Sequence, residues 1–379
     1  MDKIRLAYQY GPLQLLKLHT FYQSILRQFL SIYPALEAGR GFPSVEHLLA
    51  AMGGTKLSRI TLEQALLREQ IQKKLIDEVV GVAVKFNYGQ HPRDIHAFVG
   101  AVALLGFDKE LWAVEGGNKK VAECALRVSG AELVTGTVSR IAGKLTQLFE
   151  ISLESGEKRN FDIVVLAAPY TEDRSSILIS LEKNGKEIKI DKTPGSYLSL
   201  WSTLVRGDLN WTAAGFGLGS FTTGNTFYLS SSNVWSIESL SPVDQEPTAQ
   251  PATIYRLFSH QPLHGEDLEN LFTDIQQVVE RNWMAYPTFT ENNDYSEFQL
   301  APGLFYLNRI EQAASAMEMS VISARNIANL VAELFTSQPP EFLIGEQGNL
   351  ALDWTKCLYC CMGGAAAVYF TLKYSGGMN

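Results

Sequence analysis

The chain has 379 residues, of which 46% are hydrophobic and 19% charged, so it is long enough to bury one large core or two coupled domains. Its formal net charge of -8 gives no support for a general electrostatic attraction to phosphate backbones. Nucleic acid is therefore excluded as an expected partner.

The first hundred residues are predicted to be mainly helical. Apolar side chains recur at helical spacing between residues 13 and 33, with polar side chains such as Lys17 between them, which predicts an amphipathic helix. Ser44 is placed to cap a second helix, and Thr61 opens a third with a capping-box pattern. The predicted segments are 13–33, 44–51, the helix that opens at Thr61, 71–86, and a run of small residues suited to close packing over 100–106.

From residue 111 onward, helical and strand patterns alternate. The run 161–167 is almost continuously apolar, as in a strand buried in a parallel sheet. Residues 195–265 hold short β-like runs between Gly, Ser and Thr clusters, which predicts an antiparallel sheet. The remaining predicted elements are helices over 119–128, 265–282 and 317–335, and strands over 132–141, 145–153 and 304–308.

The four cysteines are too few for a disulfide scaffold, and three of them, Cys357, Cys360 and Cys361, lie close together in the tail. No second Cys or His pair stands at zinc-finger spacing in the sequence, so we expect no metal site. The uncharged run 357–372 is shorter than the roughly 20 residues of a membrane-spanning helix. A palmitoylated or membrane-contacting tail and a mis-spliced or disordered end are both open interpretations.

Histidines occur in two short groups. Pro262 stands between His260 and His264 and disfavours the helix that would align them, so these two are interpreted as loop residues. His91 and His96 are interpreted as surface or packing residues, with proton handling as the alternative.

Three places carry features suited to a bulky or anionic cofactor. Gly116 and Gly117 precede a predicted helix, and paired glycines let a backbone come close to a ring or a phosphate. The predicted strand over 161–167 ends at Ala168-Pro169. The predicted helix that begins at Met317 has a partially positive N-terminus that would favour an anionic group, although an ordinary core helix explains the same periodicity.

Six segments resemble the prenylcysteine oxidase family, whose members are also called prenylcysteine or farnesylcysteine lyases, and they occur in that family's order. The resemblance extends from about Ile4 to Phe335, and the residues from Thr336 onward are not part of it. The six segments are Tyr88-Gly89-Gln90, Gly100-Ala101-Val102-Ala103-Leu104, 111–119, 204–210, Ala285-Tyr286-Pro287 and 311–320.

The resemblance implies an oxidoreductase that uses FAD and dioxygen to cleave the thioether of S-farnesyl- or S-geranylgeranyl-L-cysteine. The products would be cysteine, an isoprenoid aldehyde and hydrogen peroxide, in the breakdown of prenylated proteins. Such chemistry asks the protein for orientation and a dry pocket, because sulfur and the allylic double bond both stabilise the cation left by hydride loss. Relatives usually work in lysosomes or vacuoles, and the printed sequence has no recognisable targeting signal.

The resemblance also implies an α/β fold of the FAD-dependent amine-oxidase-like type, with a flavin domain and a substrate domain made of an antiparallel sheet and helices. The Gly-x-Gly-x-x-Gly turn of the first Rossmann βαβ unit is not in the printed sequence, and the nearest string, Gly215 to Gly219, has the wrong spacing. We therefore expect an N-terminally incomplete version that does not retain FAD, with a cofactor-free relative as the alternative. The expected segments are helical substrate domain 1–110, flavin domain 111–170, substrate domain with the antiparallel sheet 171–300, flavin domain 301–335 and an unassigned tail 336–379.

Position by position, the resemblance implies which residues contact the ligands. The residues expected to bind FAD are Gly116, Gly117, Val138 (through its backbone), Ala168, Pro169, Asn308, Glu311, Met317 and Glu318. Phe21, Ile25 and Tyr88 are expected to line an apolar substrate tunnel, although plain packing of the first long helix explains Phe21 and Ile25 equally well. Asn210 opens an Asn-x-Ser/Thr sequon and is the candidate glycosylation site. No catalytic side chain is expected, since the flavin carries the chemistry.

Two other functions are consistent with the sequence. The first is a non-catalytic isoprenoid-binding or scaffold protein that keeps the apolar pocket without FAD. The second is an amine oxidase of the same fold, which would be expected to carry an aromatic cage at the flavin. Flavin retention, peroxide production and substrate profile distinguish the three.

Overall fold

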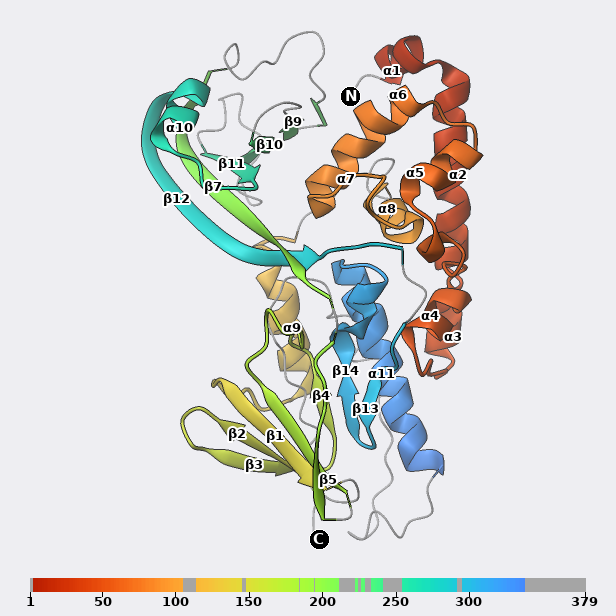
Figure 1. Cartoon of the computed structure of the whole chain (residues 1–379), viewed down its shortest axis with the longest axis vertical. Helices are drawn as coiled ribbons and strands as arrows, with labels where there is room; N and C mark the ends of the chain where they lie inside the picture. The colour runs from red at the N-terminus through yellow and green to blue at the C-terminus, as the bar shows by residue number, and fades with distance from the viewer. Residues whose placement is uncertain are drawn as a thin grey trace. The chain divides into compact units, whose positions relative to one another are not determined.

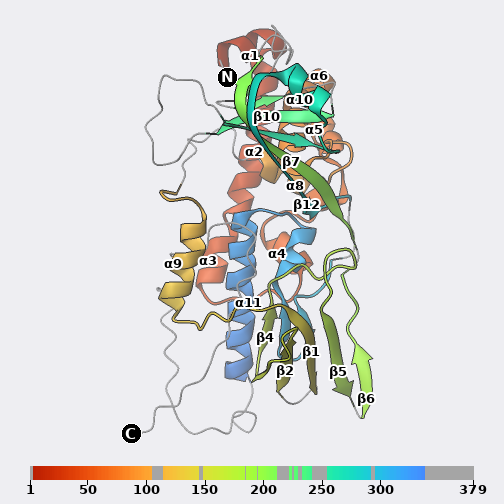
Figure 2. The same ribbon diagram turned by 90° about the vertical axis from the view of Figure 1, so that its left-hand side faces the viewer.

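The computed structural model describes residues 3–104, 114–144, 148–183, 185–193, 195–210, 222–223, 226–228, 233–240, 254–291 and 295–337. The predictions for the glycine string 215–219, for the sequon residues after Asn210 and for the cysteines of the tail fall outside these ranges. The chain forms two compact units, each assembled from three stretches of sequence (Figure 1, Figure 2). Unit 1 comprises 1–27, 56–112 and 197–293, and unit 2 comprises 28–55, 113–196 and 294–379. Within the described ranges, no helix is both long and apolar enough to cross a membrane.

One helix of unit 1 begins at the N-terminal capping signal that the sequence predicts. Thr61 Oγ1 accepts a hydrogen bond of 3.1 Å from the Gln64 N–H, and the Gln64 side chain accepts one from Thr61 N, so the predicted capping box is confirmed. An added Cβ at Gly100 would come 2.6 Å from Leu62 Cδ2, which explains the small residue at this helix contact. The helices are α1 (Lys3–Tyr10), α2 (Pro12–Phe29, whose last two residues belong to unit 2), η1 (Leu57–Arg59), α5 (Leu62–Arg68), α6 (Lys73–Leu75), the π-helix η2 (Ile76–Val80), α7 (Gly81–Tyr88), α8 (Ala97–Leu104) and α10 (Gly265–Leu271).

The sheet of unit 1 has six strands in the order β12-β7-β11-β10-β9-β8, and every described pair is antiparallel, which confirms the predicted antiparallel sheet. One face packs Val205, Ile237 and Leu257 against Leu268 of α10. A second cluster contains Trp235 with other large side chains and the α7 residue Phe86. The strands are β7 (Tyr197–Leu209), β8 (Thr222–Thr223), β9 (Thr226–Tyr228), β10 (Val234–Leu240), β11 (Ile254–Ser259) and β12 (Phe272–Pro287).

The helix predicted over 265–282 is wrong beyond Leu271. Residues 272–287 form β12, which pairs with β7 from Phe272 opposite Leu209 to Pro287 opposite Tyr197. The Glu, Gln and Arg residues of this segment favour a helix locally, but pairing with a 13-residue strand decides the conformation. Tertiary pairing therefore overrides the local propensity.

The described residues of unit 2 form two sheets. The five-stranded sheet has the order β3-β2-β1-β5-β6, and the three-stranded sheet has the order β13-β14-β4, in which β4 runs parallel to β14 as predicted for a buried strand. The strand predicted from residue 132 begins only at Val138, and the strand predicted over 304–308 ends at Tyr306. The strands are β1 (Val138–Lys144), β2 (Phe149–Leu153), β3 (Lys158–Phe161), β4 (Val164–Leu166), β5 (Leu178–Lys183), β6 (Lys186–Lys189), β13 (Gln299–Ala301) and β14 (Leu304–Tyr306).

The helices of unit 2 support the segment 36–42 through buried amides. The Asn326 side chain accepts a bond of 2.7 Å from Phe42 N and donates one of 2.9 Å to Phe42 O, which satisfies both backbone groups. Asn329 donates to the carbonyls of Leu36 and Arg40, both at 2.9 Å. The helices are α3 (Ile32–Glu37), α4 (Val45–Ala51, with Ser44 as N-cap as predicted), α9 (Lys119–Ser129), the 3-10 helix η4 (Leu307–Gln312) and α11 (Met317–Ser337).

Candidate functional site

The carboxyl ends of β4 and β14 lie at one edge of the three-stranded sheet of unit 2. The two strands are in parallel register, with Val164 beside Leu304 and Leu166 beside Tyr306, so the residues that follow each strand emerge together. Ala168-Pro169 follows β4 and Asn308 follows β14. Because parallel sheets bind ligands at the carboxyl ends of their strands, this edge is the candidate site, and it unites two of the predicted cofactor segments.

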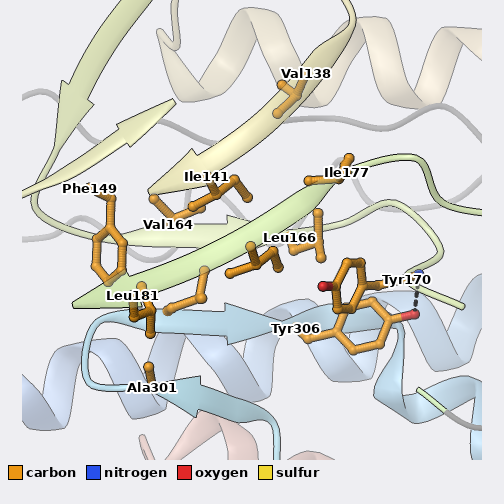
Figure 3. Close-up of a cluster of buried hydrophobic side chains, with 12 residues drawn as sticks. Val138, Ile141, Phe149, Val164, Leu166, Tyr170, Ile177, Leu181, Ala301 and Tyr306 are labelled. Carbon is orange, nitrogen blue, oxygen red and sulfur yellow. Dashed lines mark hydrogen bonds between the residues drawn. The ribbon is translucent and has the colours of Figure 1, made fainter. Parts of the chain in front are cut away.

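Two tyrosines fix this edge. The backbone N–H of Tyr170 donates a buried hydrogen bond of 2.8 Å to Tyr306 Oη, and the two rings meet edge to face with centroids 6.1 Å apart. Figure 3 shows this bond beside the apolar side chains of β1, β4 and β5 that pack against it. Burial raises the pKa of Tyr306 to about 12, so its hydroxyl stays neutral. The segment after β4 is thereby tied to the end of β14.

Two residues directly after β14 carry buried polar atoms for which the described residues provide no hydrogen bond. The side-chain oxygen of Asn308 is buried and has no hydrogen-bond partner among the described residues, and the same holds for Arg309 Nε. Arg309 is 8% exposed, donates a bond of 2.8 Å from Nη1 to Thr193 Oγ1, and lies 5.3 Å from the centre of the Tyr306 ring. Buried polar atoms are nearly always paired, so Asn308 Oδ1 fits a donor group of a ligand and Arg309 Nε fits an acceptor or anionic group.

Arg309 was not found from the sequence. Burial lowers its pKa, and among the described residues no carboxylate forms an ion pair with it. The sequence signal is only that a charged residue lies close to the apolar run Leu304 to Leu307. A local pattern cannot show that such a side chain is buried.

The paired-glycine turn lies beside the start of α11. Gly116 and Gly117 have φ of +77° and +86°, a conformation that favours glycine, and a Cβ on Gly117 would meet no atom within 4 Å. Asn118 Nδ2 lies 3.9 Å from Met317 Sδ, so the two segments are neighbours although 199 residues separate them in sequence. An open turn beside a helix N-terminus would allow a cofactor to approach the backbone closely, and this role of Gly116 and Gly117 stays a prediction.

The remaining predicted FAD residues have differing surroundings. Glu311 accepts a bond of 3.3 Å from Ser315 Oγ within unit 2. Glu318 accepts one of 2.5 Å from Tyr33 of α3, and burial together with this carboxylate raises the pKa of Tyr33 well above its ordinary value. The Val138 side chain is 7% exposed and belongs to the same buried core cluster as Ile177 and Tyr306, so only its backbone would be available to a ligand. The cofactor roles of these residues stay predictions.

The predicted substrate residues all lie in unit 1 and are buried. Phe21 and Ile25 are 9% and 5% exposed on α2. Tyr88 ends α7, where its ring packs edge on against Tyr286 and Phe289 at 5.6 and 5.2 Å. A tunnel role for these residues stays a prediction, as does a glycan on Asn210, which is partly exposed.

The fold confirms the predicted α/β class, and the residues gathered at the sheet edge fit a cofactor-dependent enzyme. The Prenylcysteine lyase family model matches residues 1–341, and the chain belongs to this family, as the six sequence segments predict. Within this family the chain is an oxidoreductase of the prenylcysteine oxidase type.

Named relatives agree with this assignment. "Prenylcysteine oxidase 1" of Bos taurus is 33% identical over 352 residues, which cover 87% of this chain and 68% of the relative. "Prenylcysteine oxidase 1" of Homo sapiens is likewise 33% identical with the same coverage. Among solved structures, "Cyclohexylamine Oxidase from Brevibacterium oxydans IH-35A" is similar with a TM-score of 0.45 and 11% identity, over 83% of this chain and 76% of that one.

Proposed function

We propose that the protein carries out the FAD-dependent oxidative cleavage of S-farnesyl- or S-geranylgeranyl-L-cysteine to cysteine, an isoprenoid aldehyde and hydrogen peroxide. The observation that carries this proposal is the family match over residues 1–341. Two buried atoms at the carboxyl edge of β4 and β14 support it. Arg309 Nε and Asn308 Oδ1 have no hydrogen-bond partner among the described residues and could pair with acceptor and donor groups of a polar cofactor.

FAD, when bound, would accept a hydride from the carbon between the thioether sulfur and the double bond and pass the electrons to dioxygen. Water then adds to the oxidised carbon, and the hemithioacetal divides into aldehyde and cysteine thiol. The residues described here would hold and shield the reactants, which suits a reaction that needs no protein nucleophile.

Individual residues would contribute in different ways. The Arg309 guanidinium and the Asn308 amide would hold polar groups of the cofactor, and the open backbone at Gly117 would allow close approach. The N-terminus of the 21-residue helix α11 would favour negative charge near Met317. The apolar core behind Tyr306 would keep water away from one side of the edge. Gly116, Val138, Ala168, Pro169, Glu311 and Glu318 complete the proposed FAD-binding set.

The setting of this activity is proposed by resemblance. Degradation of prenylated proteins, a lysosomal or vacuolar location, a glycan on Asn210 and peripheral membrane contact all belong to this part of the proposal. Localising the tagged protein tests the compartment, and treating the protein with a glycosidase tests the glycan on Asn210.

The proposal is tested with the purified protein in the presence of added FAD. Asn308→Asp keeps the side-chain shape but adds a negative charge, so we expect retained FAD and peroxide formation from S-farnesyl-L-cysteine to fall at least about tenfold. Asn160→Asp on the exposed strand β3 is the matched control and should change neither. A wild-type protein that holds FAD yet forms no peroxide would refute the proposed reaction and favour a non-catalytic binding protein.

A further inference from the structure

Three basic side chains of unit 1, Lys85, His91 and His260, form a group that we call the basic cluster. The ammonium group of Lys85 lies 6.0 Å from the ring centre of Trp235, and the His260 ring centre lies 4.2 Å from that ring. Burial lowers the pKa of Lys85, and burial together with the Lys85 charge lowers the pKa of both histidines. The charge of Lys85 on α7 therefore acts on His91 in the turn after α7 and on His260 directly after β11.

Within the described part of the chain, no acid neutralises this group directly. Among the described residues, no carboxylate lies within ion-pair distance of any member of the basic cluster. Asp77 and Asp94 act on His91 only at longer range, and Arg93 opposes them. A lysine in the last turn of a helix is favoured by the helix dipole, but that effect does not account for two histidines beside it.

The strand beneath the basic cluster carries two further unsatisfied polar atoms. Trp235 and Ser236 are 2% and 1% exposed, and neither Trp235 Nε1 nor Ser236 Oγ has a hydrogen-bond partner among the described residues. Both lie where the register of β10 against β11 shifts between Val234 and Ser236. Such bulges re-aim side chains and are frequent next to binding sites, and unsatisfied buried donors at one point call for a ligand or water.

The surroundings of the basic cluster are aromatic. Phe258 belongs to the same buried cluster as Trp235. The ring centres of Phe86 and Trp283 lie 6.3 and 6.2 Å from the ring centre of Phe258. The Trp283 side chain is 40% exposed. Unpaired positive charge next to large apolar rings suits a ligand that joins an anionic group to a hydrocarbon chain.

We propose that the basic cluster binds the α-carboxylate of an S-prenylcysteine, with the neighbouring aromatic rings against the start of its prenyl chain. The inference rests on the proposed function, since it assigns a subsite to that substrate. Lys85 would supply a charge-assisted hydrogen bond, and His260 would be held in place by its stacking on Trp235.

Binding, measured separately from turnover, tests the inference. Isothermal titration calorimetry would compare S-farnesyl-L-cysteine with S-farnesyl-L-cysteinamide, which has the same shape but no carboxylate. We expect the wild-type protein to bind the acid at least about tenfold more tightly than the amide. Lys85→Gln and His260→Gln should each weaken acid binding without changing amide binding, and Lys85→Arg should restore much of the preference.

Controls separate this inference from the proposed function. Lys56→Gln removes an exposed lysine elsewhere in unit 1 and should leave the acid preference intact. Equal binding of acid and amide, no binding of either, or a preference that survives both Lys85→Gln and His260→Gln would overturn the inference. If acid and amide bind equally, or if the preference survives both substitutions, peroxide formation from S-farnesyl-L-cysteine would still support the proposed function. Carboxylate-dependent binding without any peroxide would support the subsite and refute the oxidase.

Discussion

Replacing Arg309 with Met separates a cofactor role from a structural role. The side chain is 8% exposed and has a single described hydrogen bond, to Thr193, and its guanidinium lies 5.3 Å from the centre of the Tyr306 ring. Losing these two contacts costs about 1 kcal/mol each. Burying an ion without an acid partner costs several kcal/mol, which methionine avoids.

The expected result therefore has two opposite parts. Without FAD, Arg309→Met should leave the free energy of unfolding unchanged or raise it by about 1–3 kcal/mol. With FAD, the loss of a hydrogen bond to a charged group should weaken cofactor affinity about 10- to 100-fold. Urea unfolding of the FAD-free protein and a flavin fluorescence titration measure the two effects.

Arg159→Met is the matched control. Arg159 lies on β3 and pairs with Glu132 and Glu157 at the surface, so its loss should change the free energy of unfolding by less than about 1 kcal/mol and leave FAD affinity unchanged. If Arg309→Met destabilised the FAD-free protein while FAD affinity stayed the same, Arg309 would be a structural residue and the reasoning would fail.

Three further outcomes are expected. Gly117→Ala and Gly156→Ala each place a Cβ in open space at nearly equal positive φ, so each should lower the free energy of unfolding by about 1 kcal/mol. Only the Gly117 variant should lose FAD in a retention assay, and equal FAD loss by both variants would count against a cofactor role of Gly117. Asn326→Ala leaves both polar groups of Phe42 unpaired and should lower the free energy of unfolding by about 2–4 kcal/mol in urea, whereas a loss below about 0.5 kcal/mol would contradict the clamp. The pKa of His260 is lowered in the folded protein, so His260 binds a proton more readily in the unfolded chain and the stability of the folded protein should fall as the pH drops below 6.5. In thermal melts, His260→Gln should lose less stability over this pH range than the wild-type protein. Identical pH profiles of the two proteins would argue against the buried position of His260.

Local signals in the sequence predict the helix starts well. Ser44 and Thr61 cap their helices as expected because an N-cap depends on side chains within one turn. The buried strand β4 is also predicted, since a strand covered on both faces is apolar throughout. The long strand β12 is missed because its Glu, Gln and Arg residues carry a helical preference that only pairing with β7 overrides.

In the candidate site, too, some features follow from the sequence and others depend on tertiary packing. The cofactor segments were predicted from family resemblance, while the contact between Asn118 and Met317 depends on folding across 199 residues. Arg309 could not be identified as buried, and Lys85 could not be placed with His260, because those facts belong to packing. The cofactor role of these segments stays a prediction, whereas the buried polar atoms without a partner among the described residues can be found only from the folded chain.

The most direct measurement is the simultaneous release of thiol and peroxide by the FAD-supplemented full-length protein under air. With S-farnesyl-L-cysteine we expect equal amounts of free cysteine and hydrogen peroxide, and with the saturated S-dodecyl-L-cysteine, which lacks the allylic double bond, far less of both. A protein that binds FAD and S-farnesyl-L-cysteine but releases neither product would contradict the account.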